Sequence, residues 1–105
     1  MSDVVVVAEM SLVEGREEEA PAALGVLCTE THAKEDGCRL HALHRVMGDP
    51  TRVVMIERWD SMDALKSHAV AAPIAEFKAL TCLAPGAKIN LVEPTGHGDA
   101  EKGML

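Results

Sequence analysis

The chain has 105 residues, of which 10 are basic and 17 acidic, so that its formal net charge is −7. This length fits one domain with a single core, and the negative charge repels polyanions, so we expect no nucleic acid and no anionic membrane as partners. Hydrophobic residues make up 48% of the chain, but Trp59 and Phe77 are its only aromatic residues, so Val, Leu, Ala and Met must build the core.

The N-terminal half predicts a strand followed by a helix. Residues 4–13 are rich in β-branched residues, and the valine run over residues 4–7 is typical of a strand that is covered on both faces. Residues 17–36 show helical spacing of small and apolar side chains, with three glutamates near the positive end of the helix dipole. Pro21 must either lie within the first turn of this helix or bend it, and Gly37 is expected to end it.

The C-terminal half predicts a hairpin, two short helices and a last strand. Strands over residues 38–46 and 52–60 flank a Gly-Asp-Pro turn. Ser61 caps a helix that begins at Met62, and Pro73 fits the first turn of a second helix. Residues 87–93 form the last strand, and the small, polar segment 95–105 is expected to be a flexible tail beyond a domain over residues 1–94.

This element order predicts an α+β, ferredoxin-like split βαβ fold, with one antiparallel four-stranded sheet and helices on one face. The other face of such a sheet also carries apolar side chains. A second copy of the chain is the simplest cover for it, so we expect a homodimer. The N-terminus has no basic region and no apolar run long enough for a signal peptide or a membrane span, which predicts a cytoplasmic protein.

The stretch GCRLHALHR, residues 37–45, places a cysteine and two histidines close together, as in some metal sites. Side chains alternate along a strand, so His41 and His44 point to opposite faces and cannot chelate one ion. Cys38 and His44 share a face but lie about 20 Å apart at roughly 3.3 Å per residue. We therefore expect no metal site here unless a distant segment supplies ligands.

The hairpin register brings other side chains together. If Val46 opposes Arg52, then His41 opposes Glu57, Leu43 opposes Met55, and Arg39 opposes Trp59. One face would then carry His41, Glu57 and Trp59 with three apolar residues, Leu43, Val53 and Met55.

A carboxylate beside an imidazole favours the imidazolium and raises its pKa, which suits a general base near neutral pH. The alternative is an ordinary cross-strand pair of His41 and Glu57 that contributes about 0.2 to 1 kcal/mol. His68, on the inner face of its helix, is a second candidate for the same pocket, or else a partly buried histidine bonded to backbone. Trp59 fits the wall of an aromatic-binding pocket, and also the core.

The run VVMIERWDSMDALKSHAVAAPIAEF, residues 53–77, resembles the antibiotic biosynthesis monooxygenase (ABM) family. Members often read F-V-x-x-E-x-W-x-S, then A-L, then a helical histidine. Glu35-Asp36-Gly37-Cys38 and the Asp49-Pro50 turn extend the similarity to roughly residues 3–94. The resemblance implies a dimeric α+β barrel.

Three branches of this family are distinguished by residues of their pockets. Polyketide-type members use tyrosines, and this chain has none. The heme-degrading branch uses Asn, Trp and His, whereas Asn90 is the only asparagine here and His68 stands where that Trp aligns. The quinol monooxygenase branch is closest, although Pro73 occupies the place of its second histidine.

The resemblance thus implies a cofactor-independent monooxygenase that acts on a small quinol-like or dihydroxy-aromatic substrate and O₂, with neither metal nor flavin. Catalysis would involve His41 or His68 as the base and Glu57 as its partner. Residues expected to line the substrate pocket are Trp59, Met55, Leu43, Ile74 and Phe77. The alternatives are a non-catalytic small-molecule-binding or regulatory domain, and an isomerase or lyase that uses the same pocket.

Overall fold

The structure, a computed structural model, describes residues 3–105. Its elements are β1 (Val4–Ser11), α1 (Glu19–Lys34), β2 (Cys38–Arg45), β3 (Arg52–Trp59), α2 (Met62–Ala69), α3 (Ala72–Ala79) and β4 (Lys88–Val92). The strands form one sheet in the order β2-β3-β1-β4, and every neighbouring pair is antiparallel. The predicted α+β, ferredoxin-like fold is confirmed.

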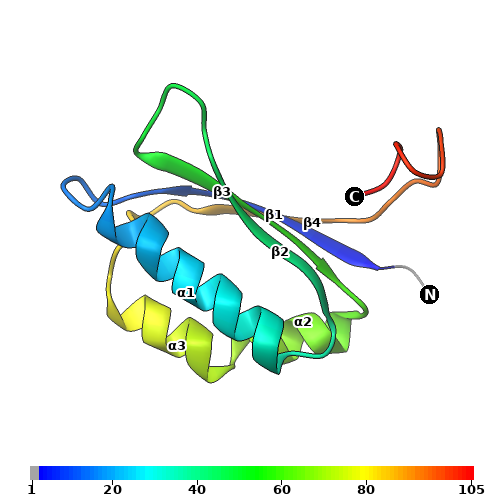
Figure 1. Cartoon of the computed structure of the whole chain (residues 1–105), viewed down its shortest axis with the longest axis horizontal. Helices are drawn as coiled ribbons and strands as arrows, with labels where there is room; N and C mark the ends of the chain where they lie inside the picture. The colour runs from blue at the N-terminus through cyan, green and yellow to red at the C-terminus, as the bar shows by residue number, and fades with distance from the viewer. Residues whose placement is uncertain (1–2) are drawn as a thin grey trace.

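The helices all lie on one side of the sheet (Figure 1). Helix α1 begins after Glu18, so that Pro21 falls in its first turn, where a missing N–H breaks no helical hydrogen bond. Ser61 caps α2 by accepting a hydrogen bond from the backbone N–H of Ala64, at 3.1 Å. The core lies between sheet and helices, and its largest fully buried apolar side chains are Trp59, Leu24 and Val53.

The hairpin register is confirmed for the pairs His41 with Glu57 and Leu43 with Met55. The prediction that Arg39 opposes Trp59 was wrong: the register shifts between Cys38 and Leu40, and Cys38 opposes Trp59. Such an irregularity leaves one residue of the strand without a partner across the ladder. The Arg39 side chain instead binds the Asp60 carboxylate through Nε and Nη2.

Strand β4 is a poorly covered edge. All five of its residues are exposed, and Ile89 and Leu91 expose 61% and 52% of their surface. The C-terminal segment lies on the side of the sheet away from the helices (Figure 1). There Arg58 pairs with Asp3 and donates a hydrogen bond to the backbone oxygen of Leu105. Across residues 3–105, none of the helices is both long and apolar enough to cross a bilayer.

Candidate active site

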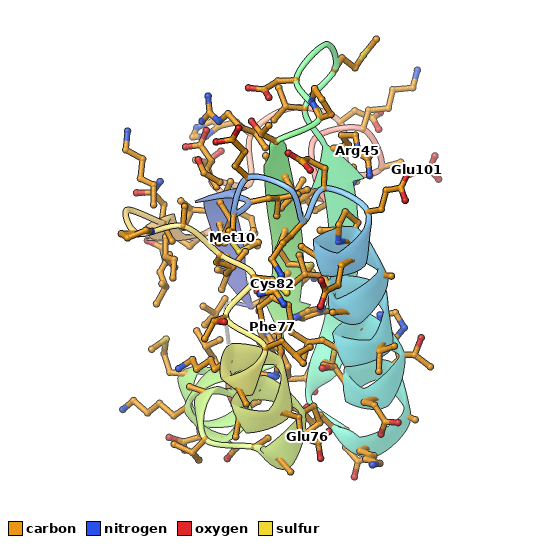
Figure 2. All side chains as sticks on the ribbon, turned by 90° about the vertical axis from the view of Figure 1, so that its left-hand side faces the viewer. Met10, Arg45, Glu76, Phe77, Cys82 and Glu101 are labelled. Atoms are coloured by element: carbon orange, nitrogen blue, oxygen red, sulfur yellow. The ribbon has the colours of Figure 1, made fainter. Side chains whose placement is uncertain are left out.

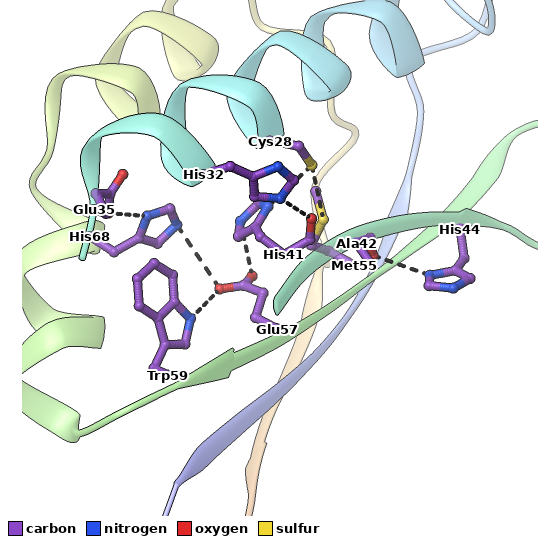
Figure 3. A network of polar contacts seen from close by, with 10 residues as sticks. All are labelled: Cys28, His32, Glu35, His41, Ala42, His44, Met55, Glu57, Trp59 and His68. Atoms are coloured by element: carbon purple, nitrogen blue, oxygen red, sulfur yellow. Dashed lines mark hydrogen bonds and ion pairs between the residues drawn. The ribbon is translucent and has the colours of Figure 1, made fainter. Parts of the chain in front are cut away.

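Three side chains from three elements converge under the helices (Figure 3). His41 comes from β2, Glu57 from β3 and His68 from α2, and all three are buried. His41 Nε2 lies 3.7 Å from Glu57 Oε2, and His68 Nε2 lies 4.0 Å from Glu57 Oε1. One ligand atom from each residue can be chosen so that all three lie within 4.8 Å of one another. We call these residues the His-Glu-His cluster.

A second set of contacts fixes the orientation of the cluster. His68 Nδ1 lies 2.7 Å from Glu35 Oε1, and because a carboxylate only accepts, the Nδ1–H group donates this hydrogen bond. His41 Nδ1 lies 3.1 Å from Cys28 Sγ. Trp59 Nε1 donates a hydrogen bond of 2.9 Å to Glu57 Oε1. Both histidines are therefore held through Nδ1, and their Nε2 atoms are left facing the glutamate.

The other histidines lie around or away from this cluster. His32 Nε2 donates to the carbonyl oxygen of His41 at 2.9 Å, which ties α1 to β2. His44 is exposed on the other face of the sheet and bonds the carbonyl of Ala42, as its place in the strand predicts. His97 is exposed in the C-terminal segment.

The charge state of His41 differs from the sequence-based expectation. Burial, followed by the proximity of His68 and His32, lowers the pKa of His41 to about 4, whereas the sequence predicted an increase caused by Glu57. The prediction was wrong because it counted a carboxylate partner but not desolvation. Burial likewise raises the pKa of Glu57, against the opposing effects of the Trp59 hydrogen bond and of His68. His41 is therefore a neutral imidazole at neutral pH.

The same desolvation governs the thiol behind His41. Burial raises the pKa of Cys28 to about 11, so this cysteine is a protonated thiol rather than a thiolate. Its sulfur also lies 3.7 Å from Met55 Sδ, to which it donates. When the Cys28 thiol donates its hydrogen to Met55 Sδ, Cys28 Sγ is free to accept from His41 Nδ1–H, and His41 Nε2 then directs its lone pair toward Glu57.

A cavity of about 180 Å³ borders the cluster and has a mainly apolar lining. It is lined by all three members of the cluster and by three of the predicted substrate-binding residues, Met55, Ile74 and Phe77. Figure 2 shows Met10 on β1, a further residue of the lining, and Phe77 on α3, with Cys82 between them on the segment after α3. Trp59 and Leu43 lie outside the lining, and Trp59 instead packs against His68 at 4.5 Å between ring centroids.

Two members of the site were missed by sequence reasoning. Glu35 was part of the stretch that carried the family resemblance, but no role was given to its carboxylate. Cys28 lies within the predicted helix over residues 17–36, and nothing in that pattern indicates its contact with His41. The chain separation between Glu35 and His68 is 33 residues, so only the path of the chain between α1 and α2 brings them together.

Fold and site together define a class of protein: a small α+β domain that encloses a buried acid–base cluster beside an apolar cavity. The sequence model of "Antibiotic biosynthesis monooxygenase" matches residues 3–80, which is most of the chain. The chain therefore belongs to the antibiotic biosynthesis monooxygenase family, as its resemblance implied.

Solved structures of several bacterial proteins share this fold. A Mycobacterium tuberculosis protein is 25% identical with a TM-score of 0.80, and the match covers 93% of this chain and 100% of the other. A Caulobacter crescentus protein proposed to be an antibiotic biosynthesis monooxygenase is 23% identical with a TM-score of 0.81, covering 88% and 89%. One from Nitrosomonas europaea, proposed to be the same, is 17% identical with a TM-score of 0.81, covering 90% and 91%. No curated protein matches the chain.

Proposed function

We propose that this protein is a monooxygenase that oxidises a small quinol-like or dihydroxy-aromatic molecule with O₂ and needs no cofactor. The observation that carries this proposal is the position of the His-Glu-His cluster on the wall of a mainly apolar cavity. Such a reaction needs a base to ionise a phenol, and a dry pocket that protects the reactive intermediates from water.

The volume of the cavity favours a substrate with one ring. An apolar cavity of about 150 Å³ is enough to bind benzene. The cavity of about 180 Å³ beside the cluster therefore fits a single ring with two hydroxyl groups, and is small for a fused polyketide. Ile74 and Phe77 from α3 and Met55 from β3 would contact the faces of this ring.

The substrate itself supplies all the electrons that the reaction needs. The base removes a phenolic proton, the anion passes one electron to O₂, and the resulting radical pair combines to a hydroperoxide on a ring carbon. Removal of the proton on that carbon then breaks the O–O bond, which gives a hydroxyquinone and releases the second oxygen as water. A benzenediol, C₆H₆O₂, and O₂ thus give C₆H₄O₃ and H₂O, so no external reductant is required.

Of the two candidate bases, His68 is favoured by its surroundings. Its Nδ1 is held by Glu35, so Nε2 faces the interior with a free lone pair, and a carboxylate behind the ring stabilises the imidazolium that forms. Burial lowers the pKa of His41 to about 4, which makes it a weak base at neutral pH. We propose that His68 takes the phenolic proton, and that His41 and Glu57 bind the hydroxyl groups of the substrate.

Oxygen consumption by the purified, chelator-treated protein with a panel of benzenediols tests this proposal. We expect O₂ uptake that falls at least a hundredfold in His68→Gln and stays unchanged in His44→Gln, whose imidazole lies on the opposite face of the sheet. Tight binding of the diol without O₂ uptake would instead indicate a non-catalytic binding domain. Conversion of a substrate without O₂ uptake would indicate an isomerase or lyase, and either result would overturn the proposal.

We also propose that the chain works as a cytoplasmic homodimer. The sheet face away from the helices carries the half-buried apolar side chains Val7, Val54 and Ile56. A second copy packed on this face would remove these side chains from water. The three cysteines are free thiols, which agrees with a reducing compartment.

A further inference from the structure

We infer that the His-Glu-His cluster is also a binding site for one divalent first-row transition ion, with His41 Nε2, His68 Nε2 and the Glu57 carboxylate as its ligands. This inference goes beyond the proposed function and does not depend on it, because ion binding is measured without substrate or O₂.

The first argument is that three acceptors face one another. When His68 Nδ1–H donates its hydrogen bond to Glu35 and Nε2 carries no proton, the ring presents the lone pair of Nε2 to Glu57. His41 presents Nε2 in the same way when its Nδ1–H bonds Cys28. Two lone pairs and a carboxylate thus converge in a buried space, an arrangement that a cation between them would stabilise.

The second argument is distance. Ligands at about 2.0 to 2.1 Å from a tetrahedral ion lie roughly 3.4 Å apart. The separations from Glu57 are 3.7 Å to His41 and 4.0 Å to His68, and no two of the three ligand atoms need be more than 4.8 Å apart. Small side-chain rotations would complete the site. They would shorten the two separations from Glu57 by a few tenths of an ångström, and the separation between the two histidine nitrogens somewhat more.

The third argument is the support behind each ligand. Metal-binding histidines usually donate their other ring N–H to a carboxylate or another acceptor, which fixes the ring and strengthens the ligand. His68 has Glu35 in this position and His41 has Cys28. The second oxygen of Glu35, Oε2, is buried without a hydrogen-bond partner among residues 3–105, so within these residues His68 is the hydrogen-bond partner of this carboxylate. Glu57 is in turn oriented by Trp59.

The ligand set selects the kind of ion. Two imidazoles and one carboxylate suit Zn²⁺, Fe²⁺ or Co²⁺ better than Ca²⁺ or Mg²⁺, which prefer oxygen ligands. Three protein ligands leave at least one coordination position open, and the cavity lies on that side of the cluster. The argument against a metal site from Cys38, His41 and His44 still holds, because here the ligands beside His41 come from β3 and α2.

A bound ion would block the base of the proposed oxidation. It would occupy the Nε2 lone pair of His68, which is the atom that we propose as the base. The ion-loaded protein should therefore lose the cofactor-independent oxygen uptake, and a chelator should restore it. Failure of the oxidation would leave ion binding untouched, and failure of ion binding would leave the oxidation untouched, so the two proposals are separable.

Titration of the metal-free protein with Zn²⁺ by calorimetry, and with Co²⁺ by visible absorption, tests the site. We expect one ion per chain and a rise in melting temperature that a chelator reverses. Glu57→Gln and His68→Gln should each weaken binding at least tenfold, and Glu35→Gln should weaken it about tenfold through the loss of support for His68. His44→Gln is the matched control and should bind like the unchanged protein.

The cysteines are the competing ligands for these ions. Cys28→Ala should still bind Co²⁺, and the unchanged protein should show no thiolate-to-cobalt charge-transfer band. The inference is overturned if the unchanged protein binds neither ion at micromolar concentration, if Glu57→Gln binds as tightly as the unchanged protein, or if Cys28→Ala abolishes binding. The first of these results needs no variant, so a variant that fails to fold leaves the test intact.

Discussion

His41 shows how burial outweighs a neighbouring carboxylate. Its ring is almost fully enclosed, and Glu57 lies at 3.7 Å, beyond hydrogen-bond range, so the loss of hydration dominates and the neutral ring is favoured. Desolvation also disfavours the charged form of Glu57, but for a carboxyl group this raises the pKa. Desolvation therefore disfavours the charged form of both His41 and Glu57.

This desolvation predicts a pH dependence of stability in metal-free buffer. Between its ordinary pKa of 6.5 and the folded value of about 4, His41 binds a proton only in the unfolded chain. The free energy of unfolding should thus be highest above pH 6.5 and fall toward pH 4 by up to about 1.4 kcal/mol per unit, partly offset by Glu57, which takes up its proton in the folded chain first. The other titratable groups facing His41 are Cys28, His32 and His68.

Urea unfolding at pH 7.0, 5.5 and 4.5 checks this prediction. In His41→Gln the residue at this position no longer titrates, so stability should fall less steeply with acid than in the unchanged protein. Equal slopes for the two proteins would show that His41 does not titrate differently in the folded and unfolded chains.

Trp59 supplies the hydrogen bond that keeps Glu57 in place, and its side chain is fully buried. Trp59→Phe should lower the free energy of unfolding by about 1 to 3 kcal/mol, because a buried carboxyl group loses its donor. A double-mutant cycle with Glu57→Met isolates this interaction, and the tryptophan substitution should cost at least about 1 kcal/mol less in the Glu57→Met background. An equal cost in both backgrounds would mean that Trp59 contributes only packing.

At the scale of elements, the turn between α1 and β2 allows a close approach to α2. A Cβ atom added at Gly37 would lie 2.5 Å from the Cβ of Ala64, so Gly37→Ala should destabilise the fold by about 1 to 3 kcal/mol. Gly25 is the matched control: it lies within α1 with open space around it, and Gly25→Ala should stabilise by about 0.5 to 1 kcal/mol. Melting temperatures that shift in the same direction would contradict this account.

The order of the elements could be predicted from the sequence because each boundary has a local cause. Pro21, Ser61 and Pro73 mark helix starts, and the Gly-Asp-Pro turn sets a hairpin register that pairs His41 with Glu57. The shift beside Cys38 could not be predicted, because a single irregular residue leaves no clear signal in residue type. The pairing of Glu35 with His68 could not be predicted either, because it depends on how α1 and α2 are placed in space rather than on any spacing along the chain.

For the whole molecule, the uncovered sheet face predicts the oligomeric state. Sedimentation equilibrium should give twice the 11.2 kDa mass of one chain. Ile56→Asp, on the sheet face away from the helices, should shift the protein to a monomer, because a carboxylate in an apolar interface loses its hydration. Val26→Asp, on the exposed side of α1, should remain dimeric. A monomeric unchanged protein, or dissociation caused by Val26→Asp, would place the interface elsewhere.

The central claim is that a substrate in the cavity beside His68 is oxygenated by O₂ without a cofactor. Mass spectrometry of the product formed under ¹⁸O₂ by chelator-treated protein tests it most directly. The account predicts one ¹⁸O atom in the hydroxyquinone, the other in water, and one O₂ consumed per substrate. Formation of an unlabelled quinone together with hydrogen peroxide, or no product without an added metal or flavin, would contradict it.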